Sequence, residues 1–320
     1  MSNNSKNDLN LGILQPKDII HKESRKFLIF GANGWIGTQI CNYMTSQKID
    51  FYKAISRAND INGIISELNA NPEITNIMSF IGRTHGTYEG TKITTIDYLE
   101  KPGKLVDNIK DNLYSPLSLA LLCKERGLHL TYLGTGCIFE YDEKHPFGKE
   151  ENGFTETSKP NFFGSGYSVV KGFTDQLMNN SFLSSNVLNL RIRMPITDEV
   201  NERNFITKIT TYQKVCSIPN SMTVLNDMIP ILVTLAQNQV TGPINLTNPG
   251  LISHNEILEM YKEIVDPTFE WTNFNVEEQN QILASKRSNN YLDTQLLETY
   301  FPNVKNIKES VRDILISMKK

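Results

Sequence analysis

Residues 27–37 read FLIFGANGWIG, an apolar run followed by three spaced glycines. The apolar run predicts a short buried strand, and apolar residues at spacings of three and four after it predict a helix. Gly31 and Gly34 allow a tight turn between the two, and Gly37 lets helix and strand pack closely. Such a turn directs backbone amides and a helix N-terminus at a dinucleotide pyrophosphate. The expected contacts come from Gly31, Asn33, Gly34, Trp35, Ile36 and Gly37.

The rest of the chain alternates between extended and helical patterns. Extended runs lie at 50–55, 77–81, 128–133 and 187–192, and helical patterns lie at 61–70, 104–126 and 167–180. Pro116 lies inside the helix expected at 104–126 and predicts a kink, because proline removes a backbone donor. Strands that alternate with helices imply a parallel sheet with crossovers. The predicted fold is α/β, a Rossmann-type doubly wound parallel sheet with a smaller C-terminal substrate-binding lobe.

Three segments are expected along the chain. Residues 1–25 are expected to form a flexible arm, and residues 26–195 a dinucleotide-binding Rossmann domain. Residues 196–320 have a less regular pattern, with helical stretches at 229–236, 255–264 and 308–318, and are expected to form mainly the substrate-binding lobe. Part of this segment can return strands or helices to the main domain.

Composition excludes several classes of function. The 320 residues are 39% hydrophobic and 21% charged, which is typical of a globular protein. A net charge of -3 gives no diffuse basic field for nucleic acid. No apolar run reaches the ~20 residues of a membrane helix, and no secretory signal is recognised. The four cysteines form no CxxC pair, so neither a metal site nor a disulfide scaffold is expected, and a reducing cytoplasm fits best.

The residues after the second strand bear on the choice of cofactor. NAD-selective sites usually place Asp or Glu there to bind the ribose 2′-hydroxyl, whereas this chain has Ile55, Ser56 and Arg57. A guanidinium suits a 2′-phosphate, so NADPH is favoured over NADH. The alternative is that Arg57 is a solvated surface arginine.

Thr135, Tyr167 and Lys171 predict a site that reduces a carbonyl group. Tyr167 and Lys171 are four residues apart and share one helix face. A nearby ammonium lowers the pKa of a phenol, so Tyr167 could protonate a carbonyl oxygen as hydride arrives from nicotinamide. Lys171 would also hold the nicotinamide ribose, and Thr135 would orient the carbonyl. The alternative is an ordinary pair on a surface helix.

These motifs resemble those of the extended short-chain dehydrogenase/reductases, in which the Tyr-x-x-x-Lys pair lies about 130 residues after the glycine turn, as it does here. The chain further resembles a narrower family, the UDP-4-keto-6-deoxyglucose 3,5-epimerase/4-reductases of plants, fungi and large DNA viruses. The matching stretches run from about residue 26 almost to the C-terminus. They are Gly34–Gly37, Thr135–Asp142, Tyr167–Lys171, Arg191–Pro195, Asn204–Thr210, Ile218–Met222, Thr247–Gly250, Ser253–Tyr261 and Arg287–Asn290.

The resemblance implies two reactions in one pocket: inversion at C3 and C5 of a keto sugar, then reduction at C4 by NADPH to give UDP-L-rhamnose. Both inverted carbons are α to the C4 ketone, so each inversion needs a base, an acid and stabilisation of an enolate oxygen. The family assigns proton transfer to the positions that match Cys137 and Lys208.

The residues themselves give a partial reason to accept this pair. If the extended geometry continued past Leu133, Cys137 would face the same side as Thr135. The Lys208 ammonium would then lower the pKa of the thiol. The alternatives are a small buried hydrophobic role for Cys137 and a solvated helix charge for Lys208.

Arg287 and Asn204 are expected to bind the diphosphate and sugar of the substrate, because arginine grips a diphosphate with two donors. Their alternatives are a surface ion pair and a helix cap. The segment from Gly82 to Glu100 differs from the plant loop but is expected to border cofactor and sugar, with Gly82 on the cofactor side. His85 in this segment is expected to have a structural or substrate-contact role.

The resemblance also implies a homodimer formed through the helices at 104–126 and 167–180. Two other functions compete with the bifunctional one. A reductase alone would lack the proton-transfer pair, so Cys137 and Lys208 distinguish the two. A non-enzymatic NADP-binding regulatory subunit need not keep a proton donor, and intact Thr135, Tyr167 and Lys171 argue against it. The sequence leaves open the choice of UDP or dTDP, the order of the inversions and the final acceptor of the sugar.

Overall fold

A six-stranded sheet lies at the centre of the computed structural model, which describes residues 25–319. The arm expected at residues 1–25 lies, apart from Arg25, outside the described residues. Every strand pairing in the sheet is parallel. Its strands, in spatial order, are β11 (Gly242–Asn245), β7 (Val187–Ile192), β6 (His129–Thr135), β3 (Asn76–Ser79), β1 (Phe27–Phe30) and β2 (Phe51–Lys53).

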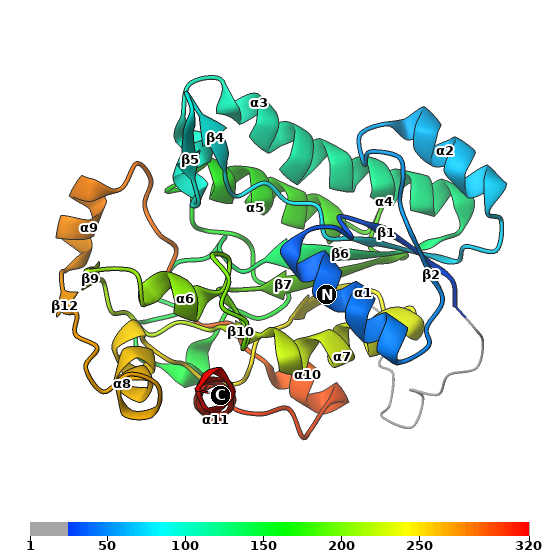
Figure 1. The fold of residues 1–320 in the computed structure, drawn as a ribbon. Coiled ribbons are helices and arrows are strands. Elements are labelled where there is room, and N and C mark those ends of the chain that lie inside the picture. The colour runs from blue at the N-terminus through cyan, green and yellow to red at the C-terminus, as the bar shows by residue number, and fades with distance from the viewer. Residues whose placement is uncertain (1–24, 320) are drawn as a thin grey trace, which may run out of the picture.

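Helices cover both faces of this sheet (Figure 1). One layer contains α2 (Ile61–Ala70), α4 (Ser115–Arg126) and α5 (Gly166–Met178), and the other contains α1 (Trp35–Ser46) and α7 (Leu225–Gln237). Phe27 and Ile29 of β1 face the core beneath α1 and α7. Leu28 and Phe30 face the opposite core. Because β1 is buried on both faces, its sequence is a continuous apolar run, and the predicted doubly wound sheet is confirmed.

The strand order reverses at β1, since β2 lies on one side of it and β3 on the other. In open α/β sheets, ligands bind beyond the carboxyl ends of the strands at this reversal. Gly31 follows the last residue of β1 directly. The glycine turn is therefore located where the topology opens a crevice.

The helix expected at 104–126 is continuous in the structure, with a π turn inside it. It consists of α3 (Lys104–Ile109), a π-helical turn (Lys110–Tyr114) and α4, with Pro116 in the first turn of α4. Proline cannot donate to the carbonyl of Asn112, four residues earlier. The Thr174 hydroxyl of α5 donates to that carbonyl instead, at 2.7 Å. The expected kink is thus absorbed by a π turn and a partner from another helix.

The C-terminal part of the chain is divided between the sheet and a smaller lobe. α7 and β11 complete the sheet, and α10 (Gln295–Tyr300) packs on the same core as α7. The smaller lobe has its own apolar core beneath α6 (Phe205–Ile209), α8 (His254–Ile264) and α11 (Ile307–Met318). Its short parallel pairs are β8 (Pro195–Ile196) with β10 (Thr223–Val224), and β9 (Lys214–Val215) with β12 (Thr272–Asn273).

Short elements complete the fold. The segment after β3 forms an antiparallel hairpin, β4 (Gly86–Tyr88) and β5 (Thr91–Ile93), and then a 3-10 helix, η2 (Ile96–Glu100). Another 3-10 turn covers Glu150–Asn152, and α9 (Val276–Ile282) follows β12. Within residues 25–319, none of the helices combines the length and apolarity that crossing a bilayer requires.

Candidate active site

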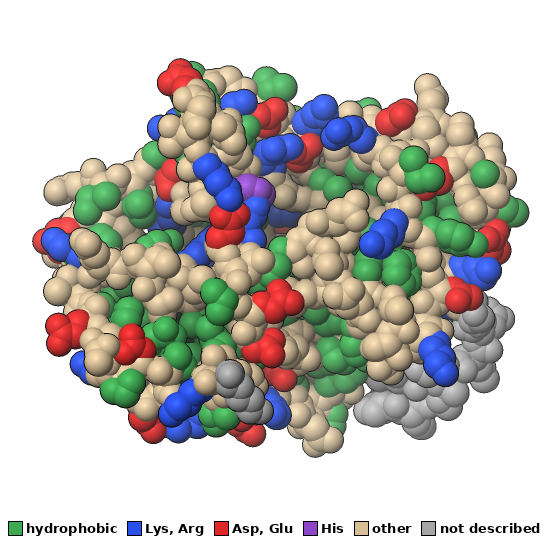
Figure 2. Space-filling model, in the orientation of Figure 1, with side chains coloured by type: hydrophobic (Ala, Val, Ile, Leu, Met, Phe, Trp, Pro, Cys, Tyr) green, Lys and Arg blue, Asp and Glu red, His purple; other side chains and the backbone are tan. Residues whose placement is uncertain are grey.

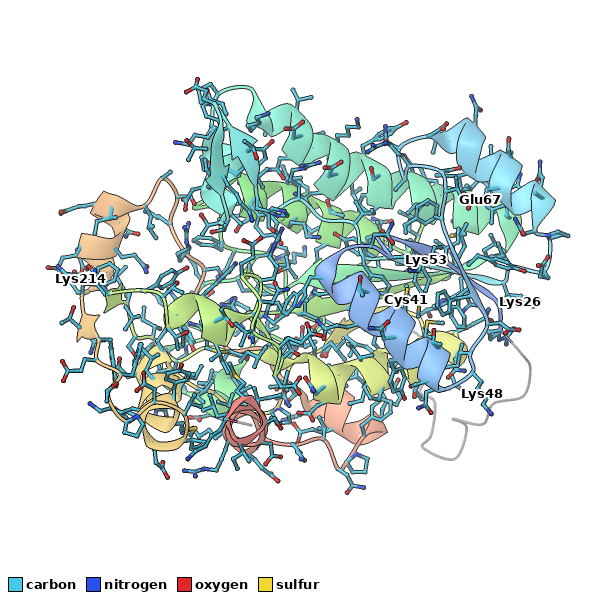
Figure 3. The ribbon with its side chains drawn as sticks, in the orientation of Figure 1. Lys26, Cys41, Lys48, Lys53, Glu67 and Lys214 are labelled. Carbon is cyan, nitrogen blue, oxygen red and sulfur yellow. The ribbon has the colours of Figure 1, made fainter. Side chains whose placement is uncertain are left out.

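One cleft of about 1400 Å³ runs along the carboxyl edge of the sheet and into the smaller lobe. Single small-molecule sites usually measure roughly 300–1,000 Å³, so this cleft has room for a dinucleotide and a second ligand. Figure 2 shows Lys and Arg side chains and a histidine around a hollow beneath the β4–β5 hairpin. The cleft reaches Lys214 of β9, on the opposite side of the molecule from Glu67 of α2 (Figure 3).

The glycine turn forms a cradle that side chains would fill. Gly31 has φ +77°, and a Cβ on it would lie 2.9 Å from the carbonyl carbon of Phe80. A Cβ on Gly37 would lie 2.1 Å from the Gly31 oxygen, which is far inside contact distance. Gly34 begins α1 without a side-chain cap, so the first amides of that helix remain available to an anion. These residues fit a dinucleotide pyrophosphate.

The expected turn residues divide into two roles. The cleft is lined by Asn33, Gly34, Trp35, Ile36 and Gly37, and on its other side by Gly82. Gly31 is not among the lining residues; it lets the backbone turn beneath them. Each of these positions therefore lies at the cofactor end of the cleft or directly supports it.

Arg57 lies outside the lining of the cleft and is exposed. The loop before it is held by Glu67 of α2, whose carboxylate accepts the Ile55 N–H at 2.9 Å and the Ser56 N–H at 3.1 Å. Glu67 is thus an acidic residue near the end of the second strand, but both of its oxygens are used by backbone amides. A role for Arg57 in binding a 2′-phosphate remains a prediction.

Thr135, Tyr167 and Lys171 come together on one wall of the cleft. Thr135 is the last residue of β6, and the other two lie in the first turns of α5, which Ser165 caps by accepting the Ser168 N–H. All three side chains are buried, with Tyr167 only 8% exposed. The structure therefore brings together the three residues that the sequence predicted for reduction.

The electrostatics of this group differ from the expectation. The pKa of Tyr167 is raised, first by burial and then by Cys137, and a hydrogen bond from Thr135 only partly opposes this. Lys171 is not among the groups that shift it, and its ammonium donates to the Tyr132 hydroxyl at 2.5 Å. Burial lowers the pKa of Lys171 to about 8. The predicted lowering of the Tyr167 pKa by Lys171 is therefore wrong for this structure, and Tyr167 is a protonated phenol at neutral pH.

Cys137 lines the cleft, and the extended geometry expected past Leu133 continues to Thr135 but not to Cys137. β6 ends at Thr135, and Cys137 lies in the turn that follows. Its N–H donates to the Thr135 hydroxyl at 3.0 Å, and its carbonyl accepts the Ser168 hydroxyl at 2.7 Å. A hydrogen-bonded turn therefore directs Cys137 to the site.

Lys208 of α6 also lines the cleft. Its pKa is lowered, first by burial and then by the positive charges of Arg203 and Arg287. Burial lowers the pKa values of Lys171 and Arg193, and Cys137 acts on both in the opposite direction. The thiol and Lys208 share the cleft, and the expected effect of Lys208 on Cys137 remains a prediction.

Arg287 lines the cleft and pairs with Asp97 of η2, with Nη2 2.5 Å from Oδ2. Its Nη1 also donates to the Ser285 hydroxyl at 2.6 Å. A guanidinium is thus present at the mouth of the substrate lobe, held by a carboxylate from a distant loop. Both the expected ligand contact and the alternative ion pair are compatible with this position.

Asn204 is fully buried and is not among the lining residues. Its Nδ2 donates to the carbonyls of Thr197 and Glu199, both at 2.7 Å. Its Oδ1 accepts the Ile206 N–H at 3.3 Å and so caps α6. The side-chain amide is used entirely by the backbone, which corresponds to the helix-cap alternative.

His85 lies in the cleft beside Arg203, whose guanidinium donates to its Nε2. Burial first, and then Arg203 and Arg83, lower the pKa of His85 to about 4. His85 is therefore a neutral acceptor at physiological pH. Lys92 of β5 pairs with Glu202 at 2.6 Å, so the hairpin is tied to the loop before α6 at two points.

Sequence reasoning missed three residues of the site: Tyr132, Asp97 and Arg193. Tyr132 and Arg193 lie near the carboxyl ends of neighbouring strands, where parallel sheets place functional groups, and that rule could have indicated both. Asp97 pairs with a residue 190 positions away, and no local pattern indicates that contact. Among residues 25–319, no group of three His, Cys, Asp or Glu side chains is arranged to hold a metal ion.

Comparisons with known proteins agree with this arrangement. Residues 27–209 match the profile of the NAD dependent epimerase/dehydratase family. An uncharacterized protein of Acanthamoeba polyphaga mimivirus, L780, is 52% identical over 295 residues, which cover 92% of this chain and 99% of that protein. A bifunctional dTDP-4-dehydrorhamnose 3,5-epimerase/dTDP-4-dehydrorhamnose reductase of Arabidopsis thaliana is 42% identical over 291 residues, which cover 90% of this chain and 91% of the relative.

Solved structures share the fold of this chain. The crystal structure of the L780 UDP-rhamnose synthase superposes with a TM-score of 0.86 at 50% identity, over 92% of this chain and all of that one (100%). A dTDP-4-dehydrorhamnose reductase of Bacillus anthracis, in complex with NADP, superposes with a TM-score of 0.71 over 92% of this chain and 98% of that one. At 16% identity, the second comparison shows only a shared fold.

Proposed function

Since this chain belongs to the NAD dependent epimerase/dehydratase family, we propose that it converts UDP-4-keto-6-deoxy-D-glucose to UDP-L-rhamnose by 3,5-epimerisation followed by NADPH-dependent reduction of the C4 ketone. The observation that carries the proposal is the joint placement of Tyr167, Lys171 and Cys137 in one cleft with room for two ligands. The similarity to a UDP-rhamnose synthase and to a plant epimerase/reductase along almost the whole chain supports it.

The reductive half uses Tyr167 as the proton donor. Burial keeps its phenol protonated, and the hydrogen bond from Thr135 stabilises the phenolate that remains after proton transfer to the C4 oxygen. Lys171, with a pKa of about 8, is available to contact the nicotinamide ribose and to resupply the proton. Bound NADPH would supply the hydride at C4.

The epimerising half uses Cys137 and Lys208 as the proton-transfer pair. Both line the cleft, and the lowered pKa of Lys208 brings its proton exchange closer to neutral pH. Removal of a proton α to the ketone leaves an enolate, and Tyr167 and Thr135 are placed to stabilise its oxygen. The same two residues thus serve both halves of the reaction.

NADPH is the proposed cofactor, with NADH as the weaker alternative. Arg57 is the cation of the loop after the second strand, and Glu67, the acidic residue near it, is already bonded to two backbone amides. A 2′-phosphate would therefore meet a free guanidinium and no free carboxylate in this loop.

For the substrate, we propose that Arg287 binds the diphosphate, exchanging part of its contact with Asp97 for phosphate oxygens. Asn204 is proposed to act on the sugar only indirectly, through the loop and helix that it holds in place. The diphosphate of a nucleotide sugar would thus be gripped where the η2 segment meets the smaller lobe.

Product analysis tests the proposed function. Purified protein is incubated with UDP-4-keto-6-deoxyglucose or its dTDP counterpart, with NADPH or NADH, and the products are identified by NMR. We expect UDP-L-rhamnose to form from the UDP substrate and NADPH without a helper enzyme. A reduced product that retains the original configuration at C3 and C5 would indicate a reductase alone. Binding of NADPH without its consumption would indicate a regulatory subunit.

We also propose a homodimer formed through α3, α4 and α5. Large apolar side chains are exposed along these helices: Leu105, Val106, Ile109, Tyr114, Leu121, Phe173 and Leu177. Many large apolar side chains exposed together mark interaction sites. These side chains lie on the helical segments that the family resemblance assigned to the dimer.

Light scattering after size exclusion tests the dimer. The wild-type protein is expected to have twice the mass of one chain, and Phe173→Glu is expected to halve it, because a charge would be buried in the interface. An unchanged melting temperature of the isolated variant chain serves as the folding control. Wild-type protein with the mass of one chain at micromolar concentration would refute the proposal.

A further inference from the structure

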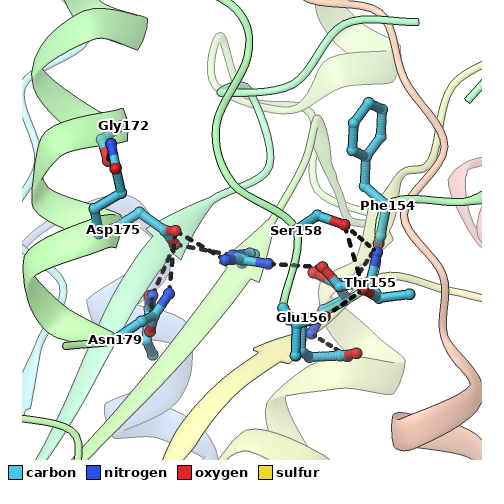
Figure 4. A network of polar contacts seen from close by, with 12 residues as sticks. Phe154, Thr155, Glu156, Ser158, Gly172, Asp175 and Asn179 are labelled. Atoms are coloured by element: carbon cyan, nitrogen blue, oxygen red, sulfur yellow. Dashed lines mark hydrogen bonds and ion pairs between the residues drawn. The ribbon is translucent and has the colours of Figure 1, made fainter. Parts of the chain in front are cut away.

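Arg191, in the last part of β7, and Arg193, just after the strand, are each only 1% exposed. Arg191 has a carboxylate partner: its Nη2 lies 2.8 Å from Asp175 Oδ2, and its Nε donates to Oδ1 at 2.9 Å (Figure 4). Arg193 forms no ion pair with any residue between 25 and 319, and its Nε–H has no hydrogen-bond partner there. The remaining guanidinium contacts are all to neutral acceptors.

Those acceptors come from three distant segments. Nη1 donates to the Gly136 carbonyl at 3.0 Å and to the Ser288 hydroxyl at 2.9 Å, and Nη2 donates to Asn220 Oδ1 at 2.7 Å and to the Ser288 carbonyl at 3.0 Å. Neutral acceptors satisfy the geometry of a guanidinium but do not compensate its charge. Burying an uncompensated charge is unfavourable. The structure thus maintains a positive charge in the wall of the cleft, which Arg193 also lines.

The charge is attached to the turn that carries Cys137. The Gly136 carbonyl accepts Arg193 and also Asn290 Nδ2, at 2.9 Å. A Cβ on Gly136 would lie 3.0 Å from Cγ of Arg193, so the stem of the arginine packs directly on the turn. Together with the hydrogen bonds of Cys137 itself to Thr135 and Ser168, these contacts fix the backbone on both sides of the thiol.

The electrostatic surroundings of Cys137 single out Arg193. The titratable groups around the thiol are Tyr167 and Lys171 of α5, Arg193 after β7, and Tyr98 of η2 with Tyr88 in the same cluster. Lys208 of α6 lines the same cleft, and burial lowers its pKa. The tyrosines are neutral at physiological pH. Lys171 has a pKa of about 8 and is bonded to Tyr132, so its charge changes within the working pH range. Arg193 is the group in this set whose charge does not titrate near neutrality.

We propose that Arg193 is a positioning residue for the epimerising half of the reaction, fixing the Gly136–Cys137 turn and holding a permanent positive charge beside the thiol. The inference rests on the proposed function. In each inversion the Cys137 thiolate takes the proton of the carbon α to the ketone, and the C–H electron pair forms the enolate. The carbon then takes a proton from the Lys208 ammonium on the other face, and exchange with solvent returns Cys137 and Lys208 to their starting states. No oxidant or reductant is consumed in this step.

The first test removes the charge. In Arg193→Met, the rate of Cys137 alkylation by iodoacetamide is measured against pH, and the alkylation of a Cys137→Ser protein is subtracted. We expect the midpoint of the thiol titration to rise by about one pH unit or more, and solvent deuterium incorporation at C3 and C5 to fall about tenfold at pH 7. Reduction of an already inverted substrate is expected to change less than about threefold, since hydride transfer does not use Cys137.

A second variant keeps the arginine and its contacts but offsets the charge. Asn220→Asp places a carboxylate at hydrogen-bond distance from Arg193 Nη2. Residue 220 does not line the cleft. The thiol midpoint is expected to rise here too, although the turn is still held. Arg191→Lys is the matched control: it alters an equally buried arginine that bonds Asp175 and not the turn, and it is expected to leave the thiol midpoint unchanged.

The outcomes separate the inference from the proposed function. An unchanged thiol midpoint in folded Asn220→Asp would overturn the electrostatic role of Arg193, even if Arg193→Met failed to fold. A rise of the same size in Arg191→Lys would also overturn it, because the effect would then be a general consequence of altering a buried arginine. If Cys137→Ser kept the deuterium incorporation of the wild type, the proposed epimerase function would fail, independently of the titrations.

Discussion

Replacing Tyr167 with phenylalanine is expected to lower the rate of ketone reduction by about 10³-fold, within the range that a general acid contributes. The change removes one oxygen from a side chain that is buried beside Thr135 and Lys171. Among the described residues, the other tyrosine that lines the cleft is Tyr212, which follows α6. Steady-state consumption of NADPH with an already inverted keto sugar measures the effect. Fluorescence titration of NADPH should show an affinity within about threefold of the wild type, since the glycine turn is untouched.

Tyr300→Phe provides the matched control for this prediction. Tyr300 is as buried as Tyr167, at 6% against 8% exposed, but lies on α10 away from the cleft. It is expected to leave the reduction rate unchanged. Wild-type turnover in Tyr167→Phe would remove Tyr167 from the mechanism. A similar loss in both variants would indicate a general structural effect.

Cys137→Ser is expected to lower deuterium incorporation at C3 and C5 by about 10³-fold, while reduction of an already inverted substrate falls less than about threefold. A hydroxyl in the same position keeps the backbone hydrogen bonds of the turn but does not ionise near neutral pH. Mass spectrometry of the sugar nucleotide in deuterated buffer measures the exchange, and hydride transfer is followed separately.

Cys41→Ser is the control for that substitution. Cys41 is also an unpaired, buried cysteine, but it lies on α1 and faces the sheet (Figure 3). Cys41→Ser is expected to leave both the exchange rate and the reduction rate unchanged in folded protein. Equal loss of exchange and reduction in Cys137→Ser would show that Cys137 supports the site without transferring protons.

Thr135 joins the two activities physically. Its hydroxyl forms a hydrogen bond with Tyr167 and accepts the N–H of Cys137 at 3.0 Å. The proton donor of the reduction and the proposed base of the inversions are therefore both bonded to one side chain at the end of β6. In the proposed function, this arrangement would let one site address both the ketone oxygen and its neighbouring carbons.

The segment from Gly82 to Glu100 has a structural role in this cleft. It forms the β4–β5 hairpin and η2, and it contributes Asp97 to Arg287 and Lys92 to Glu202. Both contacts connect the Rossmann side of the cleft to the smaller lobe.

The sequence alone determined the features whose physical cause is local. The glycine turn is one, since the clash of a Cβ at Gly37 with the Gly31 oxygen arises within seven residues of chain. The buried strand at Phe27 and the shared helix face of Tyr167 and Lys171 follow from periodicity in the same way. These local features were sufficient to predict the doubly wound sheet and the reducing group.

Only the tertiary structure decided the protonation and pairing of the side chains. Lys171 donates to Tyr132, 39 residues away, and burial rather than this lysine controls the pKa of Tyr167. Asn204 serves the backbone, and Arg193 meets Ser288 across 95 residues. Burial and Coulomb interactions depend on distance in space, and a pattern of residue types along the chain contains no such distances. For that reason the sequence indicated the candidate reacting groups, whereas the fold determines their charges.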